Sequence, residues 1–369
     1  MADDMIYKIA LSLIPGIGSI TAKSLIAYTG SAEQVFREKE KVLRQIPGVG
    51  SILANNIIHS EVMSRAGKEL EFVQKNGIKA HFYLDADYPQ RLLGCADAPI
   101  VLFVKGNPVL NCTKAISIVG TRHATEYGKK LVDQFIGVLA ERGYQMLIVS
   151  GLAYGIDIQS HKSALRTGLP TVAVLGHGLE TIYPSLHTSI ARDMVDNNGG
   201  LVSDFLSYSI IDRTNFLRRN RIIAGLSDAT IVVQSAKKGG ALVTADIANS
   251  YNRDVFAFPG RIGDLYSEGC HFLIKSNRAA LIESVSDLEY VMNWSATQSR
   301  ADAVQPCLFY DLNTDEKLIV DLLRNEGETA IDLICIKTML PMNKVSPTLL
   351  NLEFAGIVKG LPGKVFKAI

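Results

Sequence analysis

Six short apolar runs between residues 112 and 290 alternate with helix-length amphipathic stretches, and most of the runs end in glycine or serine. The runs are AISIVG (115–120), QMLIVSG (145–151), TVAVLGHG (171–178), GLVSDF (200–205), ATIVVQS (229–235) and DVFAFPG (254–260). Near-continuous apolar strands separated by helices are typical of a parallel sheet covered on both faces. The sequence therefore predicts a doubly wound, Rossmann-like α/β domain, in which ligands bind outside the carboxyl ends of the strands.

Residues 1–80 have apolar residues at three- and four-residue spacing, which predicts helices. One phrase occurs twice in this region, as IPGIGSITAKSLI at 14–26 and as IPGVGSILANNII at 46–58. Each copy resembles a SAM-like or helix-hairpin-helix element, whose glycine-rich turn serves either to present N–H groups to a DNA phosphate or simply to pack. Lys23 is weak support for DNA contact, because dense Lys and Arg do not flank either copy.

The C-terminal part begins with a polar, irregular stretch at 291–312 that reads as a linker. Three helical stretches and a hairpin-like end follow at 313–369, which predicts a winged helix. Its third helix, with SPTLLNLEFA, offers almost no basic or amide side chains to base edges, so protein contact or packing is favoured over base readout. The remaining residues, 81–290, make up the predicted α/β domain.

Charge and cysteine usage narrow the class of protein. Lys and Arg (38) nearly cancel Asp and Glu (37), so an anionic partner must be held by a local patch. The five cysteines (Cys95, Cys112, Cys270, Cys307 and Cys335) have no CxxC spacing, which favours buried free thiols over disulfides or a metal site. The acidic start MADDMIYKIA and the lack of an apolar run of roughly 18 residues predict a cytoplasmic protein without a membrane span.

Nucleotide cofactors and catalysis find little support in the motifs. The first strand leads into VGTRHATEYG, without GxGxxG, and GxxxxGK[ST] is absent, so neither NAD nor ATP is expected and no cofactor is predicted. Asp157 and His161 lie at i and i+4. We expect them to form a structural hydrogen bond that fixes their loop, the alternative being a chemical role for the pair with Ser150 or Asp204 nearby.

The stretch RTNFLRRNR (213–221) carries four arginines and no acid, and further basic residues and glycines follow the predicted strands. In a parallel sheet these residues converge on one edge, where arginine forks and glycine N–H groups suit a chain of phosphates better than one small ligand. The predicted DNA-binding residues are Arg122, Arg218, Arg219, Arg221, Lys237, Lys238, Arg261, Gly120, Gly151, Gly239 and Gly240. No metal site is predicted.

Six ordered motifs resemble the bacterial DNA-processing protein A family, also called DprA or Smf. They are SIVGTR (117–122), SGLAYGID (150–157) with His161, TVAVLGHG followed by YP (183–184), FLRRNRIIAGLSD (216–228), KKGGALVTADIA (237–248) and VFAFPG (255–260). The resemblance implies a Rossmann-like protein without known catalysis that binds single-stranded DNA, forms a homodimer and loads the RecA recombinase during natural transformation. It also implies that Arg122, Arg219, Arg221 and Lys238 fall on the phosphate-binding pocket of the family.

Some positions depart from the family pattern, notably Gln234-Ser235, where Glu-Ala is usual, and Leu217, where proline is usual. Two other classes of function stay open. One is a Rossmann-like nucleotide-processing enzyme such as a phosphoribohydrolase. These enzymes look like carriers of a PGGxGT loop and a catalytic glutamate. Here FPGRIGD lacks the second adjacent glycine of that loop, and KKGGALVTAD offers Asp246 but no glutamate at the expected spacing. The other is a regulator that reads duplex sequence through the winged helix.

Overall fold

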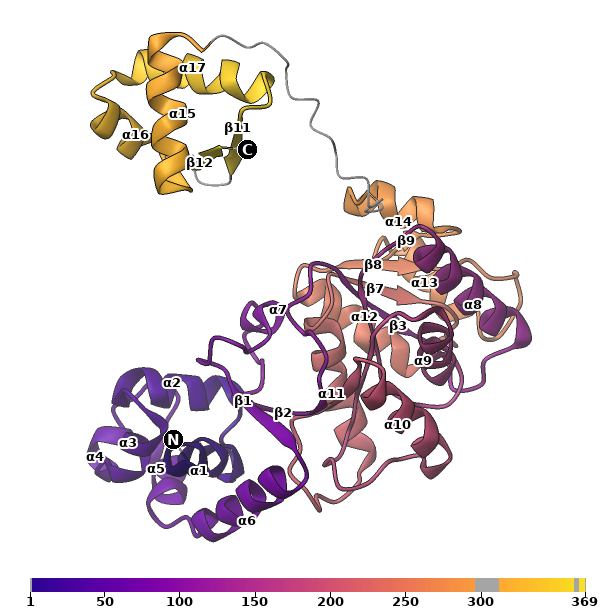
Figure 1. Cartoon of the computed structure of the whole chain (residues 1–369). Helices are drawn as coiled ribbons and strands as arrows, with labels where there is room; N and C mark the ends of the chain where they lie inside the picture. Colours follow the sequence, from indigo (N-terminus) through magenta and orange to yellow (C-terminus); the bar gives the residue numbers. More distant parts are fainter. Residues whose placement is uncertain (1, 296–311, 362–364, 369) are drawn as a thin grey trace. The chain divides into compact units, whose positions relative to one another are not determined.

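The computed structural model describes residues 2–295, 312–361 and 365–368. The chain divides into two compact units, Met1–Thr297 and Gln298–Ile369 (Figure 1). The predicted linker at 291–312 lies largely outside the described residues.

The first unit is built on a nine-stranded sheet with the order β1-β2-β6-β5-β4-β3-β7-β8-β9. All six predicted runs are strands of this sheet, and they are mutually parallel. They are β3 (Ala115–Val119), β4 (Leu147–Ser150), β5 (Thr171–Val174), β6 (Gly200–Ser203), β7 (Ala229–Val232) and β8 (Asp254–Ala257). The prediction of a doubly wound parallel sheet is confirmed.

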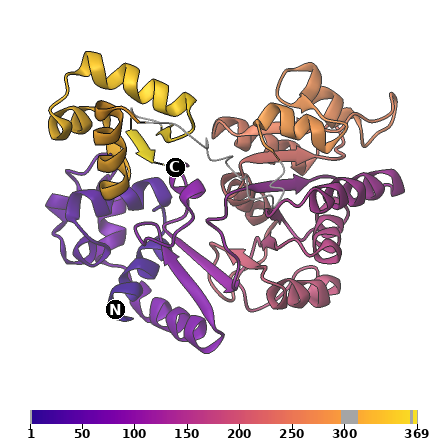
Figure 2. The ribbon, with the colours of Figure 1, turned by 45° about the horizontal axis from the view of Figure 1, so that its top comes forward.

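Three further strands were not predicted from the sequence. An antiparallel pair, β1 (Ile78–Phe82) and β2 (Val101–Gly106), extends the sheet beyond β6, and the two-residue β9 (Ala280–Leu281) ends the other edge. The predicted domain boundary near residue 80 falls inside β1. Figure 2 shows this pair next to the N-terminal helices.

Alternating side chains of the central strands pack against helices on opposite faces. In β3, Ile116 and Ile118 pack on the face covered by α8 (Glu126–Glu141), α9 (Ile156–Thr167) and α14 (Val285–Met292). Ala115 and Val119 pack on the face covered by α11 (Arg213–Gly225), α12 (Gly240–Ser250) and α13 (Glu268–Lys275). Shorter elements complete the layers: α7 (Gln90–Leu93), the 3₁₀ turn η1 (Ser185–His187) and α10 (Thr188–Asp196). Because β3 to β8 are parallel, their carboxyl ends, with the small and polar residues that follow them, lie at one edge of the sheet.

The N-terminal region is helical, as predicted. Its helices are α1 (Ala2–Leu13), α2 (Ser19–Thr29), α3 (Ala32–Arg37), α4 (Glu40–Leu43), α5 (Ser51–Ile58) and α6 (Val62–Lys75). The two copies of the repeated phrase adopt the same turn, since Gly16 has φ 84° and Gly48 has φ 83°, a region that favours glycine. Gly18 and Gly50 then occupy the N-cap positions of α2 and α5.

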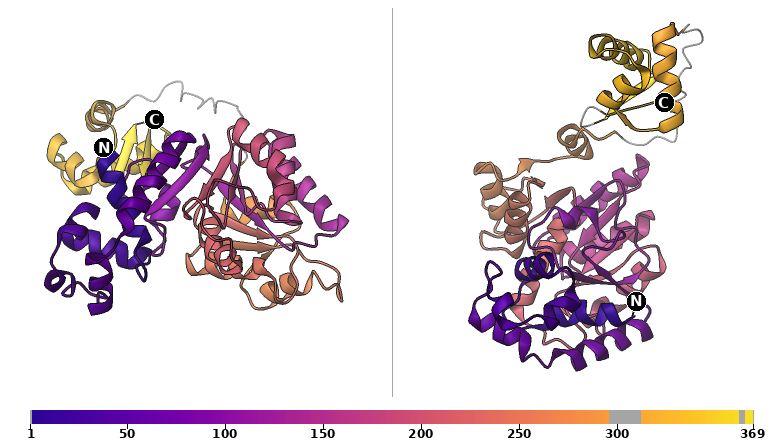
Figure 3. Two further views of the ribbon diagram at one scale, coloured as in Figure 1. Left: turned by 90° about the horizontal axis from the view of Figure 1, so that it is seen from below. Right: turned by 90° about the vertical axis from the view of Figure 1, so that its left-hand side faces the viewer.

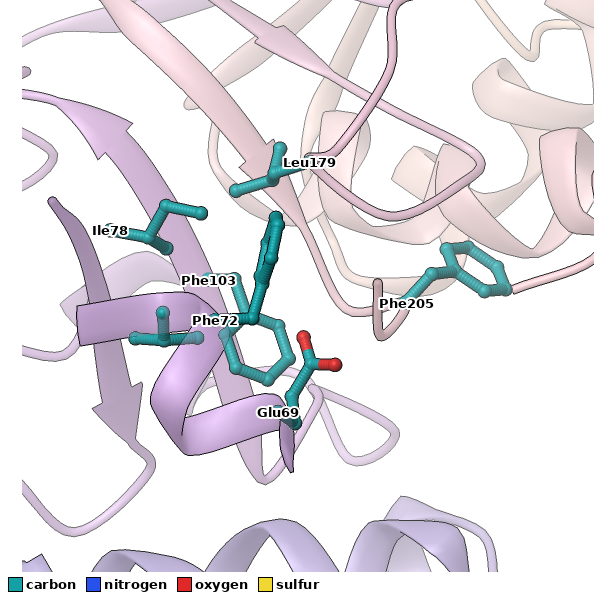
Figure 4. Close-up of a pocket in the computed structure, with 7 residues that line it drawn as sticks. Glu69, Phe72, Ile78, Phe103, Leu179 and Phe205 are labelled. Carbon is teal, nitrogen blue, oxygen red and sulfur yellow. The ribbon is translucent and has the colours of Figure 1, made fainter. Parts of the chain in front are cut away.

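These helices share one hydrophobic core with the sheet, and polar contacts fix the junction. The buried carboxylate of Glu69 on α6 accepts hydrogen bonds from the Ser207 N–H, at 2.9 Å and 3.1 Å, and pairs with Arg65. Figure 4 shows Glu69 and Phe72 beside apolar side chains from the β1–β2 pair and from the loops after β5 and β6. Lys23 donates to the carbonyl of Ala96 at 3.1 Å, so it joins α2 to the α/β part. Figure 3 gives two further views of this packing.

The second unit is a winged helix, as predicted. It contains α15 (Thr314–Glu326), β10 (Thr329–Ala330), α16 (Ile331–Thr338), α17 (Met342–Phe354), β11 (Val358–Leu361) and β12 (Val365–Ala368). The three strands form a sheet in the order β10-β12-β11. Its apolar core is separate and is made by side chains of the three helices and of the wing.

The structure also bears on the expected free cysteines and on the expected lack of a membrane span. Cys95 and Cys270 are buried free thiols, as predicted, whereas Cys112 and Cys335 are only partly buried. Cys307 lies outside the described residues. Across the described ranges, every helix is too short or too polar to traverse a bilayer.

Candidate nucleic-acid interface

The strand order reverses between β3 and β7, and at this point the loop after β3 is hydrogen-bonded to Gln234 beyond the end of β7. The N–H of Thr121 donates to the carbonyl of Gln234 at 2.7 Å, and the N–H of Thr125 donates to its side-chain Oε1 at 3.1 Å. A Cβ on Gly120 would lie 2.5 Å from Ile156. Gly120 is therefore required for close packing of α9 against the loop after β3.

Arg219 lies inside this edge, only 3% exposed. Its Nη1 donates to the carbonyl of Gly151 at 2.7 Å and also to that of Val174, so the guanidinium ties the ends of β4 and β5 together. Gly151 makes room for it, because a Cβ there would lie 2.4 Å from Nη1. Burial lowers the pKa of Arg219 to about 10, and the charge of Asp157 opposes that shift. This predicted DNA-binding arginine is thus part of the framework of the edge.

Asp157 and His161 do not form the hydrogen bond expected from their spacing, so that prediction is wrong. His161 Nδ1 lies 2.7 Å from the hydroxyl of Thr171, and burial lowers the pKa of His161 to about 3. Burial raises the pKa of Asp157, while Arg219 and backbone N–H groups of its loop oppose the shift. Both side chains are buried: Asp157 holds the loop after β4 through the N–H groups of Gly151 and Ala153, and His161 joins α9 to β5.

Arg221 is the second internally bound arginine of RTNFLRRNR. Its guanidinium pairs with the carboxylate of Asp204 after β6 and donates to the carbonyl of Asp97. Its side chain is 15% exposed. Arg221 therefore anchors α11 to two neighbouring segments. Asp204, which the alternative chemical role placed near Asp157 and His161, pairs with Arg221 instead.

Two of the other predicted arginines, Arg122 and Arg218, are exposed and lie against aromatic rings. The guanidinium of Arg122 lies 5.8 Å from the ring centroid of Phe216, and that of Arg218 lies 5.6 Å from the ring of Phe205. The ring of Tyr183 also packs against that of Phe216, with the ring centroids 5.8 Å apart, and Tyr183 is half exposed. The loop after β3 and the start of α11 thus meet in a surface that combines positive charge with aromatic faces, as single-strand binding requires.

Lys237 and Lys238 are exposed in the loop after β7, immediately before α12. Gly239 is the N-cap of this helix and lacks a side-chain cap, so the N–H groups of Gly240 and Ala241 in its first turn are available to an anion, whereas that of Leu242 donates to the carbonyl of Gly239. Arg261 is exposed in the loop after β8. The two loops are joined, because the N–H of Ser235 donates to the carbonyl of Tyr266 at 2.7 Å.

A groove of about 610 Å³ lies beside Arg122, between the first turns of α8 and α9. Its lining carries three cationic side chains, those of Arg122, Lys129 and Lys162. Tyr154 also lines it and is 42% exposed. We call this feature the α8–α9 groove.

Comparison with known proteins agrees with this geometry. Residues 79–293 match the family model of DNA recombination-mediator protein A, and residues 310–364 match that of the DprA winged helix domain. The chain belongs to the DNA recombination-mediator protein A family. The sequence resemblance to DprA and Smf proteins is confirmed.

Relatives and solved structures in this family resemble most of the chain. Protein Smf of Escherichia coli is 37% identical over 298 residues, covering 77% of this chain and 76% of the relative. The X-ray structure of DprA from Streptococcus pneumoniae superposes with a TM-score of 0.65 at 32% identity, covering 77% of this chain and 96% of that one. DNA processing protein A from Helicobacter pylori, solved to show its single-stranded DNA binding mode, gives a TM-score of 0.52 at 26% identity and covers 58% and 95%.

Sequence reasoning on this DprA family member missed the α8–α9 groove. Lys129, which precedes Lys130, and Lys162 are surface lysines of two amphipathic helices far apart in the sequence, so their spacing carries no signal. Tyr154 stands in SGLAYGID, where only its large aromatic side chain among small residues could have drawn attention. Asp246, the acid considered for an enzyme, forms a surface ion pair with Arg278.

Proposed function

We propose that this protein binds single-stranded DNA along the carboxyl edge of its sheet and thereby acts as a recombination mediator. One observation carries the proposal: five exposed cations, four in the loops after β3, β7 and β8 and one on α11, have no ion-pair partner among the described residues. They are Arg122, Arg218, Lys237, Lys238 and Arg261. Because the whole chain has a net charge of only +1, this local patch supplies the attraction for a polyanion.

The arrangement suits a single strand better than a nucleotide cofactor or a duplex. Phosphates of a flexible strand contact cations spread over several loops, while unpaired bases stack on aromatic or guanidinium planes. Phe216, with Arg122 on it, is such a plane. The loop after β3 lacks the GxGxxG of a dinucleotide site and is hydrogen-bonded to Gln234. Arg219 and Arg221 contribute by anchoring α11, which carries Arg218, to the ends of β4 and β5 and to Asp204 and Asp97.

The finer function rests on family membership. We propose that the protein loads a RecA-type recombinase on incoming single strands during natural transformation, works as a homodimer in the cytoplasm and has no catalytic activity. The single-stranded DNA binding mode described for the Helicobacter pylori relative supports the ligand class. Residues that contact a recombinase are not assigned.

Fluorescence anisotropy of labelled oligo-dT of about 30 nucleotides, across a salt series, tests the proposal. The variant Lys237→Ala/Lys238→Ala removes two exposed cations from the edge. Each lost phosphate contact on a single strand reduces the log-log salt slope by roughly 0.7, so we expect weaker binding and a slope shallower by about 1.4. The matched control, Lys68→Ala/Lys75→Ala, removes the same charge from the exposed face of α6 and leaves binding unchanged.

Other outcomes favour other functions. If the wild-type protein does not bind oligo-dT, the DNA-binding edge is wrong, and turnover of nucleoside monophosphates becomes the next assay. If a duplex of defined sequence competes better than the single strand, the winged helix is the reading module.

A further inference from the structure

The α8–α9 groove has the size and lining of a ligand site. Its volume of about 610 Å³ lies within the range of roughly 300–1,000 Å³ found for small-molecule pockets. Gly155 shapes one end, because it has φ 79° and a Cβ there would lie 2.2 Å from the carbonyl of Thr121. The chain can therefore turn into α9 directly against the loop after β3, which leaves the space between the two helices open.

Tyr154 presents a preorganised aromatic ring to this groove. Its ring packs against that of His187 at 5.0 Å and 70°. His187 is itself buried, and its Nδ1 lies 2.8 Å from the carbonyl of Leu152. The ring of Tyr154 is thus held from behind while 42% of the residue stays exposed. A fixed, half-exposed aromatic ring stacks on an unpaired base with little loss of conformational entropy.

Cations line the same groove as this ring. Among the described residues, Arg122 and Lys162 lack an ion-pair partner, whereas Lys129 pairs with the exposed Glu126 at 2.6 Å. The nearby acid Asp133 is occupied by Arg166 and by the side-chain amide of Gln159. The groove is consequently a positive site with a stacking plane.

We propose that the α8–α9 groove binds one nucleotide of a single strand, with its base stacked on Tyr154 and its flanking phosphates on Arg122 and Lys162. This inference rests on the proposed function, since Arg122 belongs to both the edge and the groove. It extends the DNA path from the loops onto the α8 and α9 face. All four bases have a face that stacks, so the site tolerates any sequence. A duplex is excluded, because its bases are covered by their neighbours.

The test uses the full-length protein and oligo-dT of about 30 nucleotides with a single 2-aminopurine moved along the strand. At saturating protein, the wild type quenches the fluorescence of 2-aminopurine at the position that stacks on Tyr154. Tyr154→Ala abolishes this quenching and weakens binding by roughly fivefold or more, whereas Tyr154→Phe keeps both. Lys162→Gln keeps the quenching and makes the salt slope shallower by about 0.7.

The control variant is Tyr127→Ala, since Tyr127 is 53% exposed on α8 and does not line the groove. It should bind and quench as the wild type does. Oligo-dT binding that is intact in wild type, with quenching unaffected by Tyr154→Ala, overturns the groove site and leaves the DNA-binding edge standing. Loss of all oligo-dT binding in wild type overturns the proposed function first.

Free dTMP and dAMP distinguish the two sources of a nucleotide. A strand site predicts that millimolar mononucleotide displaces little of the quenched oligonucleotide, because the strand is also held by the edge. If mononucleotide binds through Tyr154 while oligo-dT gives no Tyr154-dependent signal, the groove is a site for free nucleotides and the strand proposal is wrong.

Discussion

The adjacent arginines Arg218 and Arg219 should have opposite effects on folding and on DNA binding. Arg219→Ala removes a charged donor from two buried carbonyls and takes from the buried Asp157 the larger of the two positive charges that act on it, leaving that of Arg122. Breaking such a buried charged set costs about 3–5 kcal/mol. Because burial of the guanidinium is itself unfavourable, as its lowered pKa indicates, its removal offsets part of this cost. We therefore expect a loss of about 3 kcal/mol.

Arg218→Ala is the matched perturbation, since the side chain is exposed and lies against Phe205. Its effect on the free energy of unfolding should stay within about 0.5 kcal/mol. Its effect on DNA binding should be a salt slope shallower by roughly 0.7. Arg219→Ala, where it is folded, should retain the wild-type salt slope.

Urea denaturation followed by tryptophan fluorescence measures the difference. Trp294 is the single tryptophan of the chain and packs against the core under α8 and α14, so it reports on the first unit alone. With an m-value of about 3 kcal/mol per molar, the midpoint of Arg219→Ala should fall by about 1 M. If Arg219→Ala unfolds like the wild type and binds DNA with a shallower salt slope, the guanidinium contacts phosphate and its assignment as a framework residue is wrong.

Two further predictions concern the same edge of the sheet. The pKa of buried His161 is lowered to about 3, so the unfolded chain binds the proton first and stability falls as pH drops from 6.5 toward 3, by about 1.4 kcal/mol per unit. His161→Asn should remove this slope in urea titrations at pH 7 and pH 5, and an unchanged slope would contradict it. Gly155→Ala should lower the free energy of unfolding by roughly 1–3 kcal/mol more than Gly168→Ala, since both have positive φ but only Gly155 has a neighbour within contact distance. Equal losses in the two variants would show that φ alone sets the cost.

The antiparallel pair β1–β2 is a part of the fold that sequence patterns do not predict. Apolar runs followed by helices predict parallel strands, and all six such runs were found. Phe103 and Val104 belong to a strand that pairs antiparallel with β6, and no crossover helix marks it in the sequence. Its pairing depends on a sheet edge that exists only once the other strands have assembled.

At the site, too, the sequence predicts one part and the packing decides another, as the arginine-rich segment shows. The sequence alone determined that RTNFLRRNR is a strongly basic helix beside the carboxyl edge of a parallel sheet, because strand and helix periodicity are local properties. Only the tertiary structure decided that Arg219 and Arg221 are directed inward, to carbonyls and to Asp204, while Arg218 stays exposed. Burial and partner choice depend on atoms far apart in the chain. For the same reason the α8–α9 groove, formed by residues from two separate helices and the loops before them, emerged only from their packing.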